Sequence, residues 1–359
     1  MRVAVDAREL TGRRTGVGRV IQGLLEAWPP GDELCLITRT PLPSTLLQPN
    51  WRTAVDSAYA SLPGALWEHV RLPRMVRASR ADALLAPNYS MPLRAPCPTA
   101  VCMHDCAPFA LPHGFRTRER WRRQAAARFA ARRAAFLFMG SRFAADEAQR
   151  TLAVAEERLL VIPWGLTRGF GAISSERIDD VQARYGIRGR SVLFVGSGLQ
   201  RRGLRELGTW MAEIGATRPD VELLVAGTKH QPGGDTAPIR HLGYVPEDDL
   251  APLYAAATVV AYPSSYEGFG LSVLEALACG TPAVASATSA LAEVYAGRAR
   301  LVPHGDGDAW KTALTALLDD ATERQRTIET GTAWARAQRW EPSATQLRAR
   351  LATAVGDSQ

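Results

Sequence analysis

Short apolar runs alternate with longer amphipathic stretches along nearly the whole chain. The short runs are bounded by residues that favour turns, which is typical of strands, and the stretches between them are typical of helices. Strands that alternate with helices predict an α/β fold built on parallel sheets. The predicted strands are Arg2–Val5, Leu34–Thr38, Ala83–Ala86, Thr99–Met103, Ala135–Met139, Leu159–Ile162, Ser191–Val195, Val221–Ala226, Thr258–Tyr262, Pro282–Ala285 and Arg300–Val302.

The strands fall into two halves, separated by a segment without periodicity. A chain of 359 residues is too long for one ordinary core and about right for two α/β domains. The Gly-rich sequence PWGLTRGFGAISSE predicts a linker around Gly165–Ser175. We therefore expect one domain over residues 1–168 and another over 169–339. The closing stretch Ala333–Ala354 predicts a helix that Pro342 breaks or kinks, and its last part, about 340–359, is expected to pack on the first domain.

A strongly basic stretch, Phe115–Phe136, predicts a further helix. Trp121, Ala125, Phe129 and Phe136 fall near one helical face, and arginines cover much of the rest. Two interpretations stay open. Either the aromatic stripe packs on a sheet and the arginines are solvated, or the helix lies on an anionic membrane surface. We favour the first, because Ala-rich faces are weak membrane anchors.

Composition and charge narrow the class of protein. Hydrophobic residues at 46% and charged residues at 22% are ordinary for a globular chain, and no apolar run reaches the ~18 residues of a membrane span. The opening sequence MRVAVDAREL indicates a first strand rather than a signal peptide, so we expect a cytoplasmic protein. Of the 43 basic residues behind the net charge of +7, only Lys229 and Lys311 are lysines. This skew weakens any inference to nucleic acid and leaves phosphate-bearing ligands or an anionic membrane surface as suitable partners.

The cysteines give little indication of a metal site. They are Cys35, Cys97, Cys102, Cys106 and Cys279. Cys102, His104 and Cys106 alternate along VCMHDC and would share one face of a strand, but no fourth ligand cluster accompanies them. We expect buried free thiols, with no metal and no cofactor.

Two turns between a strand and a helix have the composition of phosphate-binding loops. In the first, TGVG supplies Gly16 and Gly18 at the start of a helix predicted from about Val17 to Trp28, where free N–H groups favour anions. In the second, LFVGSGLQRRG places Arg201 and Arg202 just beyond the carboxyl end of a strand, where they can clamp a diphosphate.

A dinucleotide site is the rival interpretation of these loops. Neither completes G-x-G-x-x-G, because Ile21 stands at the final position of the first and Arg201 at that of the second. The lysine-bearing Walker motif is absent as well. The sequence therefore disfavours a hydride-transferring oxidoreductase.

The most specific segment is YPSSYEGFGLSVLEALACGTPAV. A strand ending near Tyr262 leads to Glu267 and a Gly-Phe-Gly bend, and a helix predicted from about Ser272 directs its free N–H groups at that bend. Glu275 follows near the start of this helix. Ionised carboxylates only accept hydrogen bonds and sugars are dense in donors, so the two acids suit the recognition of hydroxyl groups. Taken alone, the pair also fits one exposed loop acid and one solvated helix acid.

This segment resembles the E-x7-E motif of the family-four retaining glycosyltransferases, which have the GT-B fold. The resemblance extends over nearly the whole chain. It is carried by DARELTGRRTGVGRVI, VCMHDCAPFALP, FLFMGSRFAADE, VIPWGL, FVGSGLQRRG and IRHLGYVPEDDLAPLYAAATVVAYPSSYEGFGLSVLEA. It implies two Rossmann-like domains facing a central cleft, the first on the acceptor side and the second binding a nucleotide-sugar donor.

The resemblance implies a role for each residue of the E-x7-E segment. Glu275 corresponds to the acid that binds the ribose hydroxyls, and Glu267 to the acid that contacts the transferred sugar. The backbone of Phe269, Gly270 and Leu271 corresponds to the stretch along the sugar and phosphates.

Other segments extend the implied site. Arg201 matches the clamp arginine and Arg202 the second clamp position, whereas Gly243, Tyr244 and Val245 match the stretch that borders the base.

In the first half of the chain, the resemblance implies that Gly16 faces the diphosphate and that His104 lies close to the donor sugar. The residues expected to act in catalysis are His104, Arg201 and Glu267.

The chain departs from the family pattern at several positions. Arg202 stands where lysine is usual and Gly203 where asparagine is common, while Ser272 replaces a frequent proline and Trp164 an asparagine. None of these changes removes an acidic or cationic role. We therefore expect an active enzyme.

The implied activity is that of a retaining hexosyltransferase acting on a nucleotide-sugar, with mannose or a related GDP-sugar as the first candidate. The implied acceptor is a saccharide or lipid-linked saccharide in cell-surface polysaccharide or lipopolysaccharide biosynthesis, which is compatible with a peripheral place at the inner membrane face. Two alternatives stay open. One is a GT-B nucleotide-sugar epimerase, and the other is a non-catalytic protein that binds sugar nucleotides.

Overall fold

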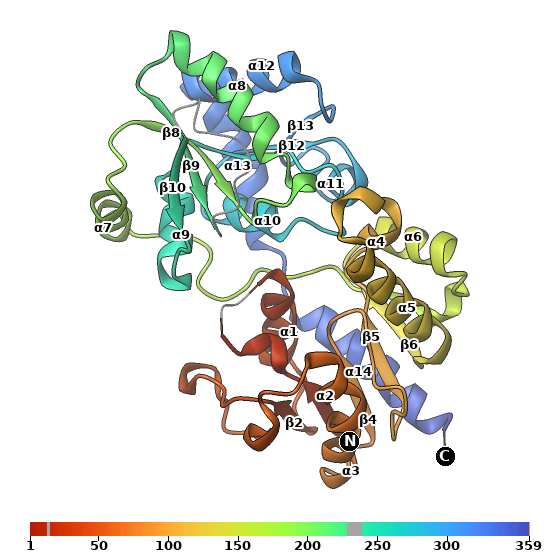
Figure 1. The fold of residues 1–359 in the computed structure, drawn as a ribbon. Helices are drawn as coiled ribbons and strands as arrows, with labels where there is room; N and C mark the ends of the chain where they lie inside the picture. Colours follow the sequence, from red (N-terminus) through yellow and green to blue (C-terminus); the bar gives the residue numbers. More distant parts are fainter. Residues whose placement is uncertain (13–14, 228–238, 359) are drawn as a thin grey trace. The chain divides into compact units, whose positions relative to one another are not determined.

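The computed structural model describes residues 1–12, 15–227 and 239–358 and separates the chain into two units. Unit 1 comprises Met1–Gly165 and Arg339–Gln359, and unit 2 comprises Leu166–Gln338. Each unit is built on one parallel sheet with helices packed against it (Figure 1). The boundary expected after residue 168 lies just beyond the point at which the chain leaves unit 1.

Unit 1 contains a seven-stranded sheet in the order β3-β2-β1-β4-β5-β6-β7, with every neighbouring pair parallel. Its strands are β1 (Arg2–Asp6), β2 (Glu33–Thr38), β3 (Trp51–Val55), β4 (Ala83–Ala86), β5 (Thr99–Cys102), β6 (Phe136–Met139) and β7 (Leu159–Val161). Its helices are α1 (Gly16–Glu26), α2 (Gly64–Val70), α3 (Leu72–Ala78), α4 (Ala107–Ala110), α5 (Thr117–Arg133), α6 (Arg142–Leu152) and α14 (Glu341–Gly356).

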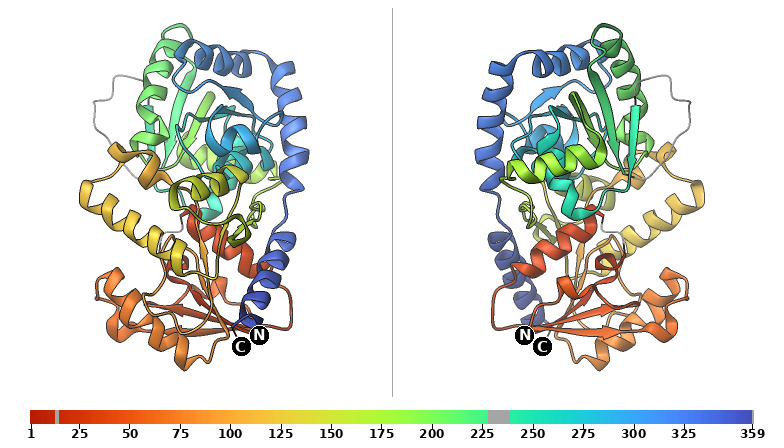
Figure 2. Two further views of the ribbon diagram at one scale, coloured as in Figure 1. Left: turned by 90° about the vertical axis from the view of Figure 1, so that its right-hand side faces the viewer. Right: turned by 90° about the vertical axis from the view of Figure 1, so that its left-hand side faces the viewer.

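The C-terminal helix α14 belongs to unit 1 and lies beside α1 (Figure 2). Trp340, just before α14, packs so tightly on Gly23 of α1 that a Cβ atom there would lie 2.2 Å from its ring. Arg348 forms an ion pair of 2.9 Å with Asp32, whose carboxylate is fully buried. The helix predicted over Ala333–Ala354 is interrupted before Pro342, which lies in the first turn of α14, where its missing N–H costs nothing.

Unit 2 contains a six-stranded sheet in the order β10-β9-β8-β11-β12-β13, again parallel throughout. Its strands are β8 (Arg190–Val195), β9 (Val221–Ala226), β10 (Ile239–Gly243), β11 (Val259–Tyr262), β12 (Ala283–Ser286) and β13 (Arg300–Val302). Its helices are α7 (Ser175–Tyr185), α8 (Leu204–Thr217), α9 (Glu247–Ala256), α10 (Leu271–Ala278), α11 (Ser289–Val294), α12 (Gly307–Asp319) and α13 (Ala321–Arg336). A short 3₁₀ helix, η6 (Gln200–Arg202), follows β8.

Every predicted strand is present, with ends that differ by at most one residue from those expected. Two strands that the pattern did not predict, β3 and β10, lie at the edges of the two sheets. Their residues are half-buried or exposed. Polar residues interrupt both strands, WRTAV and IRHLG, so neither leaves a continuous hydrophobic run, whereas the edge strands β7 and β13 keep adjacent apolar residues and are predicted.

The expected aromatic stripe on the basic helix is only partly present: Phe129 is half-buried and packs on the core of unit 1, whereas Trp121 and Ala125 are exposed. The side chains that α5 buries are alanines, Ala127, Ala130 and Ala131, and these pack on the core of unit 1. Trp121 is 66% exposed, and Phe136 belongs to β6 rather than to the helix. Small alanines allow the helix to lie close to the sheet, so the face with the largest side chain is not the face that is buried.

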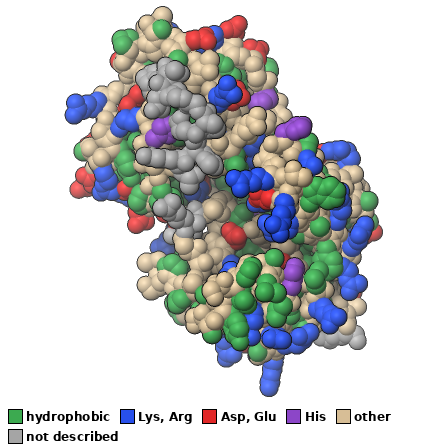
Figure 3. Space-filling model, in the orientation of Figure 1, with side chains coloured by type: hydrophobic (Ala, Val, Ile, Leu, Met, Phe, Trp, Pro, Cys, Tyr) green, Lys and Arg blue, Asp and Glu red, His purple; other side chains and the backbone are tan. Residues whose placement is uncertain are grey.

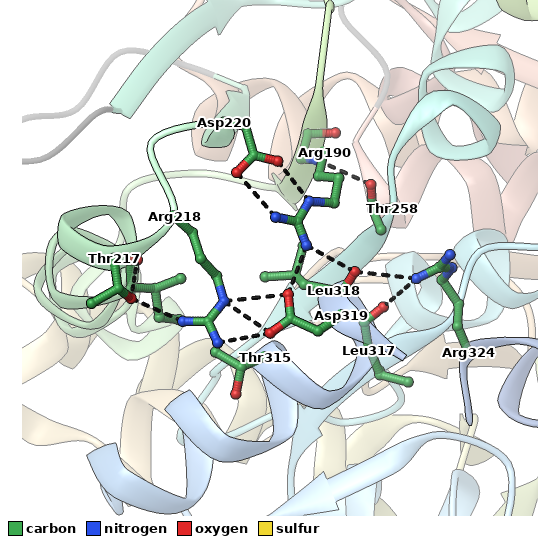
Figure 4. Close-up of polar contacts among 12 residues, drawn as sticks. Arg190, Thr217, Arg218, Asp220, Thr258, Thr315, Leu317, Leu318, Asp319 and Arg324 are labelled. Carbon is green, nitrogen blue, oxygen red and sulfur yellow. Dashed lines mark hydrogen bonds and ion pairs between the residues drawn. The ribbon is translucent and has the colours of Figure 1, made fainter. Parts of the chain in front are cut away.

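An ion-pair network closes the amino edge of the unit 2 sheet (Figure 4). Arg190, the first residue of β8, makes a bidentate contact with Asp220 at 2.7 and 3.0 Å and reaches Asp319 at 2.6 Å. Arg218 binds the same Asp319 carboxylate at 2.7 Å. The network therefore links β8, the turn before β9 and the end of α12.

Asp319→Asn tests this network. The hydrogen bond from Arg218, followed by that from Arg190, lowers the pKa of Asp319 below its usual value. The pKa of Asp319 is about 4 in the unfolded chain and lower in the folded protein, so its ionised form stabilises the fold at pH values above about 4. This stabilisation is lost as the pH falls through the folded-state pKa. Because the carboxylate is partly exposed, we expect a loss of roughly 1 kcal/mol at pH 7 that shrinks below about pH 4.

The measurement is the free energy of unfolding by urea between pH 3 and pH 7. Asp179→Asn, which removes an exposed acid on α7 of the same unit, is the matched control. Equal effects of the two substitutions at pH 7, or a difference that does not change with pH, would contradict the prediction.

Candidate functional site

The predicted binding residues of unit 2 follow the carboxyl ends of its strands. Arg201 and Arg202 follow β8, and Glu267 follows β11. In the sheet β8 and β11 are neighbours, although β9 and β10 lie between them in the chain. The order of the strands reverses at this pair, and such a reversal is where open α/β sheets bind ligands.

The loop after β8 and the loop after β11 are joined by several hydrogen bonds. Arg201 donates from Nη1 to the carbonyl of Tyr266 at 2.7 Å. The carbonyl of Arg201 accepts from the Ser264 hydroxyl at 3.0 Å and from the backbone N–H of Ser265 at 2.8 Å. The two loops therefore form one wall of the site.

Glu267 lies at the centre of this wall and is 6% exposed. Its Oε1 atom accepts from the Ser264 hydroxyl at 2.6 Å and pairs with Nη1 of Arg202 at 2.8 Å, while Nη1 of Arg201 lies 3.7 Å away. Its backbone N–H donates to the hydroxyl of Ser289, a residue with a φ of 50°, at 3.0 Å. The structure thus brings Arg201, Arg202 and Glu267 together, as the sequence predicts.

Gly203 permits the close approach of the two loops. Its φ is 70°, and a Cβ atom at this position would lie 2.4 Å from the carbonyl oxygen of Pro263. Asparagine, the residue common at this position in the resemblance, tolerates such a φ but carries a Cβ atom. The short distance between the loops therefore explains why glycine stands at position 203 in place of asparagine.

The amino end of α10 supplies backbone donors near the Glu267 loop. Gly270 precedes the helix with a φ of 91°, and the helix has neither a side-chain cap nor an acid in its first turn. Tyr295 donates a hydrogen bond of 2.8 Å to the carbonyl of Gly270 and fixes the bend. Phe269 and Gly270 are buried, and Leu271, the first residue of α10, is half-buried.

Glu275 lies deeper, in the second turn of α10, and is 1% exposed. Tyr254 donates to its Oε2 atom at 3.2 Å. Burial, and then the charge of Glu275 ahead of that of Glu267, raises the pKa of Tyr295 well above its usual value. Both acids of the motif therefore act on one buried tyrosine, although one lies in a loop and the other within a helix.

The stretch expected to border a base follows the edge strand β10. Gly243 ends this strand with a φ of 71°, and its carbonyl accepts from the N–H of Gly227 at 2.7 Å. The side chain of Tyr244 is 43% exposed, whereas Val245 is buried.

Two predicted residues belong to unit 1. Gly16 is the first residue of α1, whose N-cap, Thr15, makes no side-chain hydrogen bond and whose first turn holds no acid. No acidic side chain of the first turn therefore neutralises the positive end of the α1 dipole, which favours an anion there.

His104 follows β5, and both of its ring nitrogens have partners within unit 1. Nε2 lies 2.7 Å from the carbonyl oxygen of Pro87, and Nδ1 lies 3.7 Å from Sγ of Cys102. Burial lowers the pKa of His104, so the ring is neutral at pH 7, with the proton on Nε2 facing the carbonyl. A neutral ring held on both sides suits a positioning or contact role better than proton transfer.

The cysteine and histidine pattern does not produce a metal cluster. Within the described residues, no group of three or more His, Cys, Asp or Glu side chains could hold a metal ion. Burial raises the pKa of Cys106 to about 12, so its thiol stays protonated and is a poor ligand.

Sequence reasoning missed Tyr262, Ser264 and Ser289, which contact the predicted residues directly. The strand end at Tyr262 was visible in the sequence, but its contact with Arg202 depends on the packing of two loops that are distant in the chain. A serine in a turn is ordinary, so the pattern carried no signal for the other two.

Two family models match the chain. The model described as Glycosyltransferase Family 4 covers residues 14–168, and that described as Glycosyl transferases group 1 covers residues 189–320. Among curated proteins, the chain is 44% identical over 108 residues to O-antigen chain mannosyltransferase B of Escherichia coli, which is 30% of this chain and 28% of the relative. It is 36% identical over 194 residues to the MMP alpha-(1->4)-mannosyltransferase of Mycolicibacterium hassiacum, covering 50% of this chain and 44% of the relative. The chain thus spans less than half the length of either.

Solved structures share the fold over the whole chain. Sucrose-phosphate synthase from Thermosynechococcus elongatus is similar with a TM-score of 0.78 at 20% identity, covering 100% of both chains. HepE of Anabaena, in complex with UDP and glucose, is similar with a TM-score of 0.76 at 19% identity, covering 98% of this chain and 100% of that one. WaaG, a glycosyltransferase involved in lipopolysaccharide biosynthesis, is similar with a TM-score of 0.74 at 16% identity, covering 97% and 98%. The expected GT-B fold, with two Rossmann-like α/β units, is confirmed.

Gly203→Ala tests the close approach of the two loops. Gly280, in the same unit, has a similar φ of 83°, but a Cβ atom there would meet nothing within 4 Å. Gly280→Ala therefore measures backbone strain alone, about 1–2 kcal/mol. Gly203→Ala adds the collision with Pro263, so we expect a total loss of about 2–4 kcal/mol in the free energy of unfolding. Equal losses in the two variants, measured by urea unfolding, would show that the loops are not in the tight contact described.

Proposed function

Because this chain belongs to glycosyltransferase family 4, we propose that it transfers a hexose from a nucleotide-sugar donor with retention of configuration. The observation that carries the proposal is the convergence of Arg201, Arg202 and Glu267 where β8 and β11 meet. Two cations beside a buried carboxylate suit a ligand that is anionic at one part and rich in hydroxyl groups at another.

In this proposal Arg201 and Arg202 hold the diphosphate of the donor, together with the N–H groups at the start of α10. As the glycosidic bond breaks, negative charge grows on the leaving diphosphate. Fixed cations and backbone dipoles then stabilise the transition state more than the bound donor, which is how they accelerate the reaction. Neither a metal nor a cofactor takes part in the proposed reaction.

The two acids of the motif contact different parts of the rest of the donor. Glu275, on α10, accepts hydrogen bonds from the ribose hydroxyls, and Glu267 accepts them from the transferred sugar. Gly243, Tyr244 and Val245 border the base, and the backbone of Phe269, Gly270 and Leu271 lies along the sugar and phosphates. These assignments are supported by the family membership and by the position of the residues at the carboxyl end of β10 and in the loop and helix that follow β11.

For unit 1 we take two roles from the family pattern, Gly16 at the start of α1 as a contact of the diphosphate and His104 as a contact of the donor sugar. His104 contributes as a neutral ring, since its lowered pKa keeps it uncharged at pH 7. We assign the acceptor, a saccharide or lipid-linked saccharide, to unit 1. Exclusion of water around the donor would limit its hydrolysis.

Mannose is the first candidate for the transferred sugar, from GDP-mannose or a related GDP-sugar. Its support is that two relatives are named as mannosyltransferases, one of them for the O-antigen chain. The same relative and WaaG support a place in the biosynthesis of cell-surface polysaccharide or lipopolysaccharide. An epimerase, by contrast, would convert the donor without any acceptor, and a non-catalytic binder would leave it unchanged.

The location proposed with this donor is the cytoplasm, with α5 in contact with the inner membrane face. Among the described residues, no helix is long and apolar enough to cross a bilayer. Arg118, Trp121, Arg122 and Ala125 are exposed and recur at helical spacing, so they form one outward face of α5. Basic side chains with an exposed tryptophan suit an anionic interface. Figure 3 shows Lys and Arg side chains spread over the surface of unit 1.

The donor site is tested by titration calorimetry. First, GDP, UDP and dTDP and their sugars are screened by thermal shift, since a saturating ligand raises stability. We then expect Arg201→Ala to weaken binding of the preferred nucleoside diphosphate roughly tenfold to hundredfold, because a charge-assisted bond to phosphate is lost. Glu275→Gln should weaken the same binding, whereas Glu267→Gln should reduce the affinity for the nucleotide-sugar more than that for the bare nucleotide.

Arg205→Ala is the matched control, since Arg205 is an exposed arginine on α8 in the same unit. Unchanged affinity in Arg201→Ala, or equal losses of bare-nucleotide affinity in the two glutamate variants, would contradict the assignment. Incubation of the preferred donor without acceptor then separates a transferase from an epimerase.

The membrane contact is tested by co-sedimentation with anionic liposomes. Anionic lipid attracts a surface arginine by about 1 kcal/mol, so Arg118→Gln with Arg122→Gln should lower binding roughly thirtyfold at low salt. High salt should weaken wild-type binding as charges are screened. Trp121→Ala should reduce binding at both salt concentrations, because its contribution is apolar.

The control replaces Arg142 and Arg150, two exposed arginines on α6 of the same unit, by glutamine. A wild-type protein that stays in the supernatant at low salt, or an equal effect of the two arginine pairs, would leave α5 as an ordinary solvated helix.

A further inference from the structure

Arg202 is held by a tyrosine as well as by Glu267. Its Nη1 atom donates to the hydroxyl of Tyr262 and also pairs with Oε1 of Glu267 at 2.8 Å. Its Cζ atom lies 5.4 Å from the centre of the Tyr262 ring, which is within the range of a cation–π contact. Tyr262 thus contacts the guanidinium through both its ring and its oxygen.

The tyrosine itself is fixed by the sheet. Tyr262 is the last residue of β11, lies opposite Ala285 of β12 and is 2% exposed. A buried side chain at the end of a central strand has little freedom to turn. Arg202, by contrast, is the last residue of the short 3₁₀ helix η6, and its side chain is 20% exposed. The rigid partner therefore determines where the flexible one lies.

The two partners of Arg202 differ in how they respond to an arriving anion. The carboxylate of Glu267 competes with a phosphate for the positive charge. The phenol of Tyr262 is neutral at pH 7 and can keep its contact while the guanidinium turns toward phosphate. A planar guanidinium also presents a face to a ring, which the point charge of a lysine does not.

We propose that Tyr262 is a positioning residue that orients the Arg202 guanidinium for the diphosphate of the donor. The inference rests on the proposed function, because it takes the diphosphate as the ligand of Arg202. Tyr262 itself does not touch the ligand; its effect on binding passes through Arg202. Removing either the hydroxyl or the ring should therefore weaken binding only while Arg202 is present.

The test is a double-mutant cycle read by titration calorimetry, with GDP, UDP or dTDP, whichever the wild type binds most tightly, as the probe. We expect Tyr262→Phe, which loses the hydroxyl but keeps the ring, to weaken binding roughly tenfold. Tyr262→Leu, which loses both, should weaken it roughly thirtyfold. In an Arg202→Met background, Tyr262→Phe should change the affinity by less than about twofold, because nothing is left to orient.

Tyr185→Phe is the matched control. Tyr185, in the same unit, donates its hydroxyl to Asp249 at 2.9 Å and has no part in the proposed binding of the donor. It should leave the affinity unchanged, and thermal unfolding of all variants reports any loss of fold.

Three outcomes would overturn the inference. Wild-type affinity in Tyr262→Phe would show that the contact does not matter. The same loss with and without Arg202 would show that Tyr262 acts only through the fold. A wild type that binds none of the three nucleotides would remove the proposed function together with this inference, whereas the first two outcomes leave the proposed function standing.

Discussion

The candidate site depends on the buried charge of Glu267. A carboxylate that is 6% exposed is costly unless charged and hydrogen-bonding partners surround it. Its partners come from two loops that are distant in the chain, Arg202 from the loop after β8 and Ser264 from the loop after β11. The requirement to compensate one buried charge therefore holds these two loops together.

Two features allow the loops after β8 and β11 to meet, namely the order of the strands in the sheet and the glycines at two positions. Because β8 and β11 are parallel neighbours, their carboxyl ends meet at one edge of the sheet, and both loops leave from it. Gly203 lets the first loop touch the backbone at Pro263, and Gly270 turns the second loop into α10 where a Cβ atom would lie 2.5 Å from Leu291. Both glycines have a positive φ, a conformation that other residues adopt at a cost. These two glycines therefore allow the two loops and α10 to approach one another closely.

The sequence predicts strands that keep adjacent apolar residues, which include every central strand and the edge strands β7 and β13. Central strands leave continuous apolar runs, whereas the edge strands β3 and β10 do not. Side-chain size misled the prediction for α5, because alanines rather than Trp121 are buried. At the site, the motif places Arg202 and Glu267 beyond strand ends, and the structure pairs them. The contacts of Tyr262 and Gly203 could not be predicted, since they arise where two loops meet and no local pattern records that meeting.

The charges of the candidate site indicate which kind of ligand it can accept. Arg201 and Arg202 carry two positive charges, and Glu267 compensates one of them, so a diphosphate meets a net cation. In the proposed binding mode, however, phosphate draws Arg202 away, so that the buried carboxylate loses a partner and must find new donors. A bare diphosphate has few donors to offer, whereas a hexose attached to it carries several hydroxyl groups. In the proposed binding mode, the pair that holds phosphate therefore also makes binding depend on a hydroxyl-rich group beside it, which is the chemistry of a sugar linked to a nucleoside diphosphate.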